Sequence, residues 1–343
     1  MTDNWKRTKF YFAALSLMAI LLFMLDIVLG SVSIAIKDIF GVFFSPDKVE
    51  SHISNIIINF RLPRACVALI TGIALSVSGL QMQTVFRNPL ADPYILGVSS
   101  GASLGVALFL LGSSIFSIIL PAFISKFCIA SAAFTGSALT LFLVLIVSIR
   151  IRDIMTVLIF GIMFSGAATA IVGLLQYMSS ESALKTFVVW TLGNLGSATF
   201  DEIKVMFALT LAGLTIVVFS IKKLNVLLLG DVYAQTVGVN LKLTRTVIFI
   251  STSLLTGQVV AFCGPIGFIG IAVPHIARML FRRADHRILI PACILLGANI
   301  MLFCDIVSQL PGSNTVLPIN IVVAFVGIPV IIRIILSNKK IIN

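Results

Sequence analysis

The sequence contains a succession of apolar runs, each long enough to cross the hydrocarbon core of a bilayer. A membrane-spanning helix needs roughly 20 consecutive apolar residues. Because 59% of the 343 residues are hydrophobic and only 11% are charged, too few charges remain to cover the surface of a soluble domain. We expect an all-α polytopic membrane protein with about ten transmembrane helices in one domain, residues 1–343. The expected spans are 9–30, 62–85, 94–111, 123–149, 154–178, 203–221, 244–263, 268–281, 288–309 and 317–336.

Basic residues predict the orientation of these helices. Most of the 24 Lys and Arg residues fall on one set of alternate loops, which the positive-inside rule assigns to the cytoplasm together with both termini. Orientation thereby explains the formal charge of +11, and we expect no binding of nucleic acid. The first apolar run is too long for the core of a cleaved signal peptide. We therefore expect it to remain as the first transmembrane helix.

Three connecting segments carry more than a tight turn. Residues 33–44 have apolar positions near helical spacing and should lie on the outer face of the membrane. The apolar residues 182–196, in an external segment 182–200, are too few to cross and suit a short outward-facing or re-entrant helix. Residues 222–245 form the longest cytoplasmic connection, where Asp231 is positioned to cap a short helix running to Gly238. We expect this helix to dock on a partner protein, with a solvated surface helix as the alternative.

A faint internal echo relates the two halves of the chain. Four positions in and after the second span recur at the same spacing in and after the seventh, which predicts a 5+5 inverted repeat, an arrangement common in transporters. Chance matches between Gly-rich helices are the alternative. The matched positions are Thr71, Gly72, Gly79 and Pro89 with Thr256, Gly257, Gly264 and Pro274.

Sequence motifs of nucleotide binding and hydrolysis are absent. The chain has no G-x-x-x-x-G-K-[ST] phosphate loop, no G-x-S-x-G and no H-E-x-x-H. We therefore expect a protein that is not an enzyme and has no ATP site of its own. The three His and five Cys residues are scattered, so we also expect no directly bound metal or other cofactor.

Ionisable residues inside apolar runs are the default functional candidates. Asp26, His275 and Asp305 qualify. A proton relay between Asp305 and His275 would make the chain a proton-coupled secondary transporter, whereas the alternative has each group bond to a neighbouring helix end or backbone. Arg61 and Arg64 stand at the outer end of the second span, where they either reach lipid phosphate or hold carboxylates of an external protein.

Several motifs in order resemble those of the FecCD family of ABC-transporter permeases. The similarity covers residues 31–336 and rests on RLPR, RNPLADPYILGVSSGASLG, WTLGNLG, LLLGDVYAQTVGVN and GPIGFIGIAVPHIAR, followed by DHR and LLGA. The resemblance implies a type II importer of ferric siderophores, haem or cobalamin in the bacterial inner membrane. It also implies three kinds of partner: a second permease copy or a paralogue, two ATPase subunits that bind ATP and Mg, and a periplasmic or lipoprotein binding protein.

The resemblance also suggests roles for individual residues. The family's coupling helix, which contacts the ATPase, matches Leu229, Gly230, Asp231, Ala234, Gln235 and Gly238. Docking of the binding protein matches Arg61 and Arg64. The gates and the pathway match Asn88, Leu90, Asp153, Ile154, Trp190, Leu192 and Gly193.

Two positions depart from the family pattern. Relatives often have Arg after the Asp of the ninth span, where this chain has Ile306, and many have Glu-Leu-Pro where it reads Val316-Leu317-Pro318. The loop 309–315 also carries no charge, so docking should depend more on the two outer arginines. Among the family's cargoes we expect a ferric siderophore, carried by a homodimer, with cobalamin or haem as alternatives.

Overall fold

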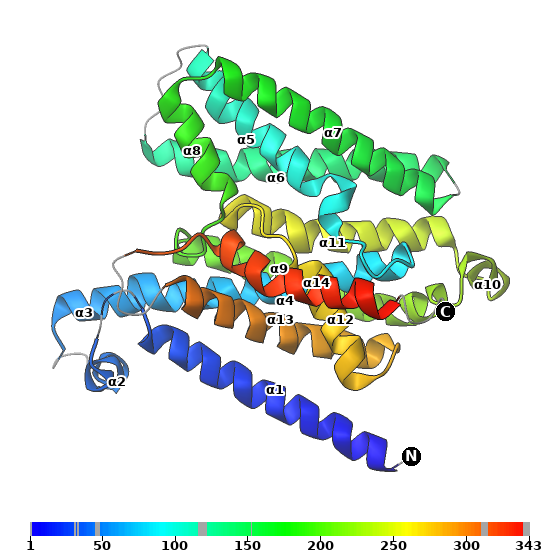
Figure 1. Cartoon of the computed structure of the whole chain (residues 1–343), viewed down its shortest axis with the longest axis horizontal. Coiled ribbons are helices and arrows are strands. Elements are labelled where there is room, and N and C mark those ends of the chain that lie inside the picture. Colours follow the sequence, from blue (N-terminus) through cyan, green and yellow to red (C-terminus); the bar gives the residue numbers. More distant parts are fainter. Residues whose placement is uncertain are drawn as a thin grey trace.

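Long helices that run nearly along one common direction make up the molecule (Figure 1). The computed structural model describes residues 2–30, 32, 34–44, 49–115, 122–151, 153–309 and 315–338, and those residues contain no β-strand. The helices are α1 (Thr2–Val28), α2 (Ile36–Phe44), α3 (Ser51–Ile56), α4 (Leu62–Val85), α5 (Val98–Ile115), α6 (Ala122–Arg150), α7 (Ile154–Met178), α8 (Glu181–Thr191), α9 (Phe200–Leu227), α10 (Asp231–Thr236), α11 (Leu241–Cys263), α12 (Ile269–Phe281), α13 (His286–Ser308) and α14 (Ile319–Asn338). A π-helical turn η2 (Ile57–Arg61) joins α3 to α4, and a 3₁₀ turn η3 (Pro93–Leu96) precedes α5.

Each of the ten expected spans coincides with a helix. Seven helices are long and apolar enough to cross a membrane, namely α1, α4 with its extension, α6, α7, α9, α11 and α13. Three shorter apolar helices, α5, α12 and α14, account for the remaining runs. The prediction of an all-α polytopic membrane protein is therefore confirmed. The sequence missed α3 and η2, because the polar residues His52, Asn55 and Asn59 interrupt the apolar pattern there.

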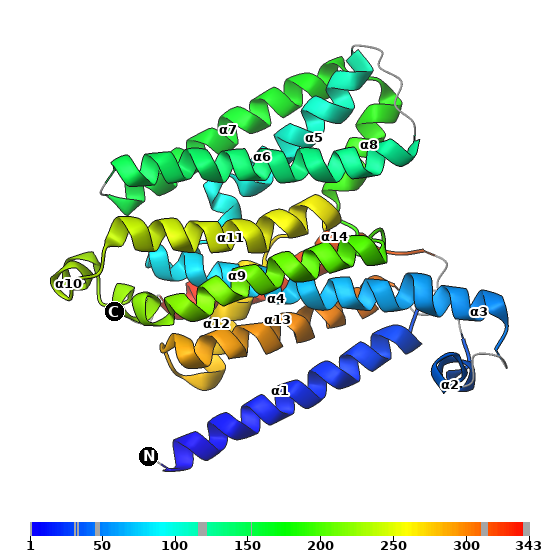
Figure 2. The ribbon, with the colours of Figure 1, turned by 180° about the vertical axis from the view of Figure 1, so that it is seen from behind.

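Helix α4 is the centre of the bundle. In its most apolar stretch 83% of the residues are buried, against 17% in α1 and 22% in α7. Figures 1 and 2 show α4 between α13 on one side and α9 and α11 on the other. Gly72 lies against the backbone of Gly297 in α13, where an added Cβ would collide with the Gly297 carbonyl. The two helices thus meet backbone to backbone, as small residues permit in membranes.

A second group of helices, α5 to α8, lies to one side of this bundle (Figure 1). Helix α5 packs against α6, α7 and α8, and α6 connects the group to the bundle through α11. Helix α7 forms the outer edge of the group (Figure 2) and leaves Met163, Leu174 and Tyr177 exposed. One long face of α7 is thus uncovered in the single chain.

The two ends of the bundle differ in what they carry. Helix α10, the start of α1 and the end of α14 share one end, which we call the α10 end (Figure 1). Helices α2 and α3 lie at the other, the α2 end, so the expected helix within residues 33–44 is present as Ile36–Phe44. Both termini therefore lie on the same side as α10. The side of the membrane that they face stays a prediction.

Two of the four matched pairs of positions in the internal echo lie in different surroundings. Gly79 is inside α4, whereas Gly264 follows the last residue of α11 with a φ of +77°. Pro89 lies in the turn after α4, whereas Pro274 is inside α12. These positions therefore do not support the inverted repeat, which stays a prediction.

Candidate functional site

Helix α10 is a single short helix set off by two glycines. Gly230, the residue before it, has a φ of +104°, and Gly238, after it, a φ of +87°. Only glycine adopts such angles without strain, so both residues define where the helix begins and ends. Asp231 does not cap this helix as predicted, since Gly230 occupies the cap position without a side-chain hydrogen bond.

The carboxylate of Asp231 instead lies between two arginines. Its Oδ2 accepts a hydrogen bond from Nη2 of Arg245 at 2.7 Å and lies 3.4 Å from Nη2 of Arg87. Arg245 is buried in the first turns of α11, and Arg87 follows α4. Asp231 thereby fastens α10 to the ends of two central helices. The sequence analysis found Asp231 but neither of its partners.

The outer surface of α10 is apolar. Val232 is 80% exposed and Leu229 is 64% exposed, and Tyr233 and Val237 are exposed beside them. Ala234 is fully buried against the bundle and Gln235 faces solvent. The helix projects from the α10 end as the outermost element (Figure 1). An exposed apolar helix at the end of a membrane bundle suits contact with another protein.

The turn after α4 and the start of α7 are each held by local hydrogen bonds. Asn88 Oδ1 accepts a hydrogen bond from the Leu90 amide at 3.0 Å. Asp153 caps α7 by accepting from the Thr156 amide at 2.9 Å, and Ile154 behind it is buried. Hydrogen bonds from Thr156, aided by the charge of Arg245, lower the pKa of Asp153 below its ordinary value. In the described part of the chain no hydrogen bond joins Asn88 to Asp153, and the inner gate stays a prediction.

A buried histidine that the sequence analysis missed joins three helices near the α10 end. His286 is fully buried, with Nε2 2.8 Å from Thr84 Oγ1 in α4 and Nδ1 2.7 Å from Asn225 Oδ1 in α9. Asn225 in turn donates to Asp285 at 2.7 Å, and Asp285 caps α13. An Asp before an apolar run, as at Asp285, is a typical sequence signal for the start of a helix. Nothing in the local sequence indicates the contacts of His286 with Thr84 and Asn225.

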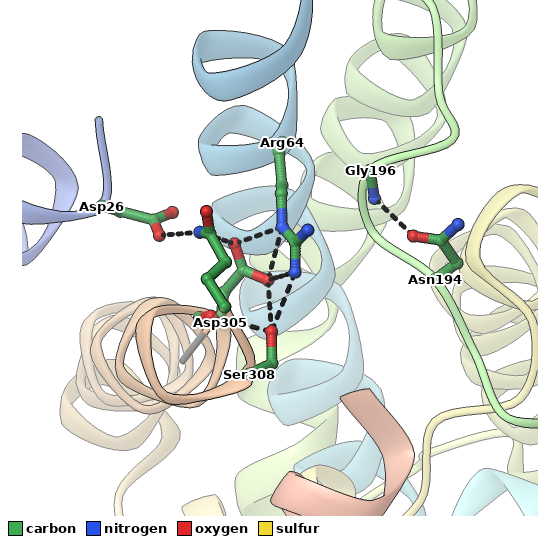
Figure 3. Close-up of polar contacts among 7 residues, drawn as sticks. Asp26, Arg64, Asn194, Gly196, Asp305 and Ser308 are labelled. Atoms are coloured by element: carbon green, nitrogen blue, oxygen red, sulfur yellow. Dashed lines mark hydrogen bonds and ion pairs between the residues drawn. The ribbon is translucent and has the colours of Figure 1, made fainter. Parts of the chain in front are cut away.

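At the α2 end, Arg64 pairs with Asp305. Its Nε lies 2.9 Å from both carboxylate oxygens of Asp305 and its Nη2 lies 2.8 Å from Oδ1 and 2.8 Å from Ser308 Oγ. Asp305 is completely buried. Figure 3 shows Asp26 on the other side of Asp305. Gln309 donates to Asp26 Oδ1 at 2.9 Å and to Asp305 Oδ2 at 3.2 Å.

This cluster, which we call the outer carboxylate cluster, comprises Asp26, Arg64, Asp305, Ser308 and Gln309. It ties α1, α4 and α13 together and holds two buried carboxylates with one guanidinium. Within the described residues, Asp26 Oδ2 has no hydrogen-bond partner. No hydrogen bond or ion pair joins Asp305 to His275 there, so the geometry does not support the proton relay.

Arg61 is buried, contrary to the expectation of an outward-facing pair of arginines. Its guanidinium donates to the carbonyl oxygens of Ile27 at 2.9 Å and Val28 at 2.7 Å, and to Val32. The carbonyls of Ile27 and Val28 lie in the last turn of α1 and have no partner within that helix. Arg61 therefore completes the end of α1 and does not reach lipid phosphate, as one alternative had it. Docking of a partner by Arg61 and Arg64 is untested, and both side chains have partners within the chain.

The segment after α8 turns back onto the bundle. Gly193 has a φ of +76°, the Asn194 amide donates to the Cys263 carbonyl at 2.9 Å, and the Asn320 amide donates to Leu192 at 3.3 Å. A cavity of about 220 Å³ opens beside it, lined in part by Trp190, Asn194 and Glu202. The expected short helix is present as Glu181–Thr191. Its role as a gate stays a prediction.

Comparison with known proteins identifies related chains. The model of the FecCD transport family matches residues 18–337. The chain is 36% identical over 280 residues to the vitamin B12 import permease BtuC of Klebsiella pneumoniae, covering 81% of this chain and 82% of that one. It is 34% identical over 287 residues to the hemin permease HmuU of Yersinia pestis, covering 83% and 84%. A solved metal-chelate type ABC transporter in an inward-facing conformation superposes with a TM-score of 0.81 and 29% identity, covering 95% of this chain and 99% of that one.

Proposed function

The chain belongs to the FecCD transport family, and from this premise we propose that it carries a ferric siderophore into the bacterial cytoplasm. It is a multi-pass permease of a type II ABC importer. Such permeases are not themselves enzymes, so the energy comes from separate ATPase subunits that bind ATP and Mg. The inner membrane is the proposed location, with the α10 end and both termini in the cytoplasm.

The observation that supports an ATP-driven importer is the surface of α10. Val232 and Leu229 present apolar side chains at the extreme end of the bundle, and Asp231 connects that helix through Arg87 to α4. A displacement of α10 by a bound protein would therefore be transmitted to α4, the most buried of the candidate spans. These features suit a contact through which an ATPase subunit drives alternating access.

A second copy of this chain is the proposed partner within the membrane. The face of α7 left uncovered carries Gly166, Ala170 and Gly173, and the space beside the two glycines is open. Small residues permit close approach of helices in a bilayer. Two such faces opposite each other would enclose a pathway wide enough for a bulky chelate.

The α2 end is the proposed landing site of the binding protein. Arg64 lines a hollow of about 350 Å³ together with Leu192, Gly193 and Val316. This hollow adjoins the segment proposed as the outer gate. A carboxylate of a docked protein would compete with Asp305 for the guanidinium.

Cobalamin and haem are the second candidates for the cargo. Two relatives are named for vitamin B12 import and hemin transport, whereas the related structure is named only for a metal chelate. A bulky metal chelate is the class that these names share. The ferric siderophore is the cargo to test first.

Uptake into proteoliposomes tests the proposal. The permease is reconstituted with its ATPase and binding protein, and entry of labelled ferric siderophore, cobalamin and haem is measured with and without ATP. ATP-dependent entry of the siderophore supports the proposal, and entry of another cargo alone replaces it. Uptake that survives ATP depletion and collapses with a protonophore would instead indicate a secondary transporter.

A second experiment isolates α10. Exchange of Val232 and Val237 for Ser removes exposed apolar surface without touching the bonds of Asp231. We expect loss of ATPase co-purification. Exchange of the exposed Val205 on α9 for Ser is the matched control and should leave co-purification intact. If the Val232→Ser/Val237→Ser variant retains the ATPase as well as the control does, the assignment of α10 is refuted.

A further inference from the structure

A basic hollow lies at the α10 end between the first turns of α1 and the end of α12. Its volume is about 380 Å³. Three arginines reach it from two segments that are far apart in the sequence, with two hydroxyl-bearing side chains beside them. These five residues are Arg7, Thr8, Tyr11, Arg282 and Arg283.

The three arginines concentrate positive charge. All three are exposed, and the described part of the chain shows no ion pair to any of them. The acidic residue nearest in sequence to Arg282 and Arg283 is Asp285, which accepts hydrogen bonds from Asn225 and from its own helix. Among the described side chains that line the hollow, three arginines are present and no carboxylate is, and a concave site of this kind attracts an anion.

The backbone at Arg282 is strained in a way that shapes the hollow. Arg282 ends α12 with a φ of +50°, a left-handed conformation that glycine adopts at no steric cost. An arginine there stores strain, and such strain is concentrated at functional sites. The turn brings the consecutive residues Arg282 and Arg283 to one hollow.

The depth of the hollow matches the boundary of the membrane. The apolar span of α1 begins at Trp5, the short apolar helix α12 ends at Phe281, and the span of α13 begins at His286. Trp5 is exposed, with Lys9 Nζ 5.6 Å from its ring centroid, and exposed Trp side chains favour the headgroup level. Three span ends and an interfacial tryptophan thus meet at one level.

Apolar surface continues from the hollow toward the membrane interior. Phe10 is exposed one residue before Tyr11, and Met279 is an exposed wall of the hollow. Farther along α1, Leu17, Leu21 and other apolar residues are exposed. This apolar surface can hold the acyl chains of a lipid, whereas a free inorganic anion would not use it.

We propose that this hollow binds the phosphate headgroup of an anionic phospholipid, whose acyl chains lie along the exposed face of α1. The guanidinium fork pairs two oxygens of a phosphate at once. Basic hollows between transmembrane helices suit such headgroups. Bound lipid would hold the first turns of α1 to the α12–α13 connection. The ring centroids of Phe12 and Phe281, which lie 4.9 Å apart, already join these two segments.

Native mass spectrometry of the delipidated full-length protein tests this site. The probes are dioleoyl phosphatidylglycerol and dioleoyl phosphatidylcholine, each titrated separately. We expect selective binding of phosphatidylglycerol and about 30-fold weaker binding in the Arg282→Gln/Arg283→Gln variant, since each surface arginine contributes about fivefold. The Arg150→Gln/Lys222→Gln variant removes the same charge from exposed positions at the same end and should bind as the parent does.

Two further measurements exclude other occupants. Inorganic phosphate that displaces the lipid at a similar concentration would overturn the lipid assignment in favour of a free anion. Loss of ATPase binding in the Arg282→Gln/Arg283→Gln variant with unchanged lipid binding would overturn it in favour of a protein contact. Equal loss of binding in both double variants would reduce the effect to general surface charge.

The Arg282→Gly variant separates lipid binding from folding. Glycine relieves the strained backbone, so we expect a higher melting temperature than the parent in phosphatidylcholine. The extra stabilisation that phosphatidylglycerol confers on the parent should fall in the same variant. A variant that keeps that extra stabilisation in full would contradict the proposal.

Discussion

The two ends of the bundle each contain an ion pair between an aspartate and an arginine of the α4 segment, and the two pairs are built differently. At the α2 end the side chains of Arg64 and Asp305 are 14% and 0% exposed, with a second buried carboxylate beside them. At the α10 end Arg87 and Asp231 are 45% and 24% exposed, with a second arginine beside them. The first pair is thus closed to water and has an additional carboxyl group beside it. The second is more exposed and has an additional guanidinium beside it.

This contrast indicates different mechanical roles. Removal of one partner of a buried pair leaves an unpaired charge in a low dielectric, which is costly. The Arg87–Asp231 pair is partly exposed, and such pairs contribute little to stability, so Arg87 can exchange partners without much loss. The outer carboxylate cluster therefore acts as a fixed joint of α1, α4 and α13, and the pair at α10 as a contact that can rearrange when another protein binds.

The largest expected effect tests the fixed joint. Arg64→Met leaves Asp305 buried without its counter-charge, and we expect a loss of about 3–5 kcal/mol in unfolding free energy. Thermal unfolding in detergent measures it. The double variant Arg64→Met/Asp305→Leu should recover most of the loss, because the Asp305 carboxylate is removed together with its counter-charge and Asp26 keeps its hydrogen bond from Gln309. A double variant as unstable as the single one would contradict the fixed joint.

The second largest loss of unfolding free energy is expected when the contacts of the buried His286 are removed. Asn225→Ala removes the acceptor at His286 Nδ1 and the donor at Asp285, and unpaired buried polar groups cost about 1–3 kcal/mol each. Thermal unfolding again measures the loss. Asn59→Ala, at an exposed position, should change stability by much less. Equal effects would show that the His286 contacts add nothing.

A smaller effect on stability is expected at α10, with a large effect on function. Asp231→Asn removes the charge of a carboxylate that is 24% exposed but keeps an amide oxygen that can accept from Arg245, and we expect a loss of about 1 kcal/mol. Uptake driven by ATP should nevertheless fall severalfold, because α10 loses its attachment to Arg87 and Arg245. Asp201→Asn, which breaks an exposed pair with Lys204, should alter neither property. Normal uptake by Asp231→Asn would remove the distinction between the two ends.

The smallest expected effect is the change with pH of the stabilisation that Asp285 contributes. The amide of Arg287, with help from Asn225, lowers the pKa of Asp285 below its ordinary value. A lowered pKa means that the carboxylate stabilises the fold fully above the ordinary Asp pKa of about 3.9 and that this stabilisation is lost as the pH falls through the lower folded value. Melting temperature should therefore respond to Asp285→Asn less at pH 3 than at pH 6. A difference that is constant from pH 6 to pH 3 would contradict this.

The sequence predicted the helices well because one physical requirement dominates them. A run of apolar residues in a bilayer must satisfy its backbone hydrogen bonds internally, so each of the ten expected spans coincides with a helix. Segments outside the spans were predicted less well. The helical turns before α4 were missed because polar residues there obscure the pattern, and the cap of α10 was assigned to Asp231 because the positive φ of Gly230 cannot be read from composition.

The partners of the candidate residues could not be predicted. Arg64 and Asp305 are separated by 241 positions, and Thr84 and His286 by 202. A single sequence contains no signal for such contacts, since they depend on which faces of two distant helices meet. Arg61 was therefore expected to face outward, although the open carbonyls at the end of α1 had to be satisfied by some donor.

The unbroken helical path from α3 through η2 into α4 has a consequence for how the protein stands in its membrane. It contains 35 residues, which at 1.5 Å per residue is about 50 Å of helix, whereas a hydrocarbon core is about 30 Å thick. Roughly 20 Å of the same rod must therefore rise above the lipid tails. Because α4 is also the most buried helix of the bundle, a force applied by a protein bound at this protruding end is transmitted to the helices packed around α4.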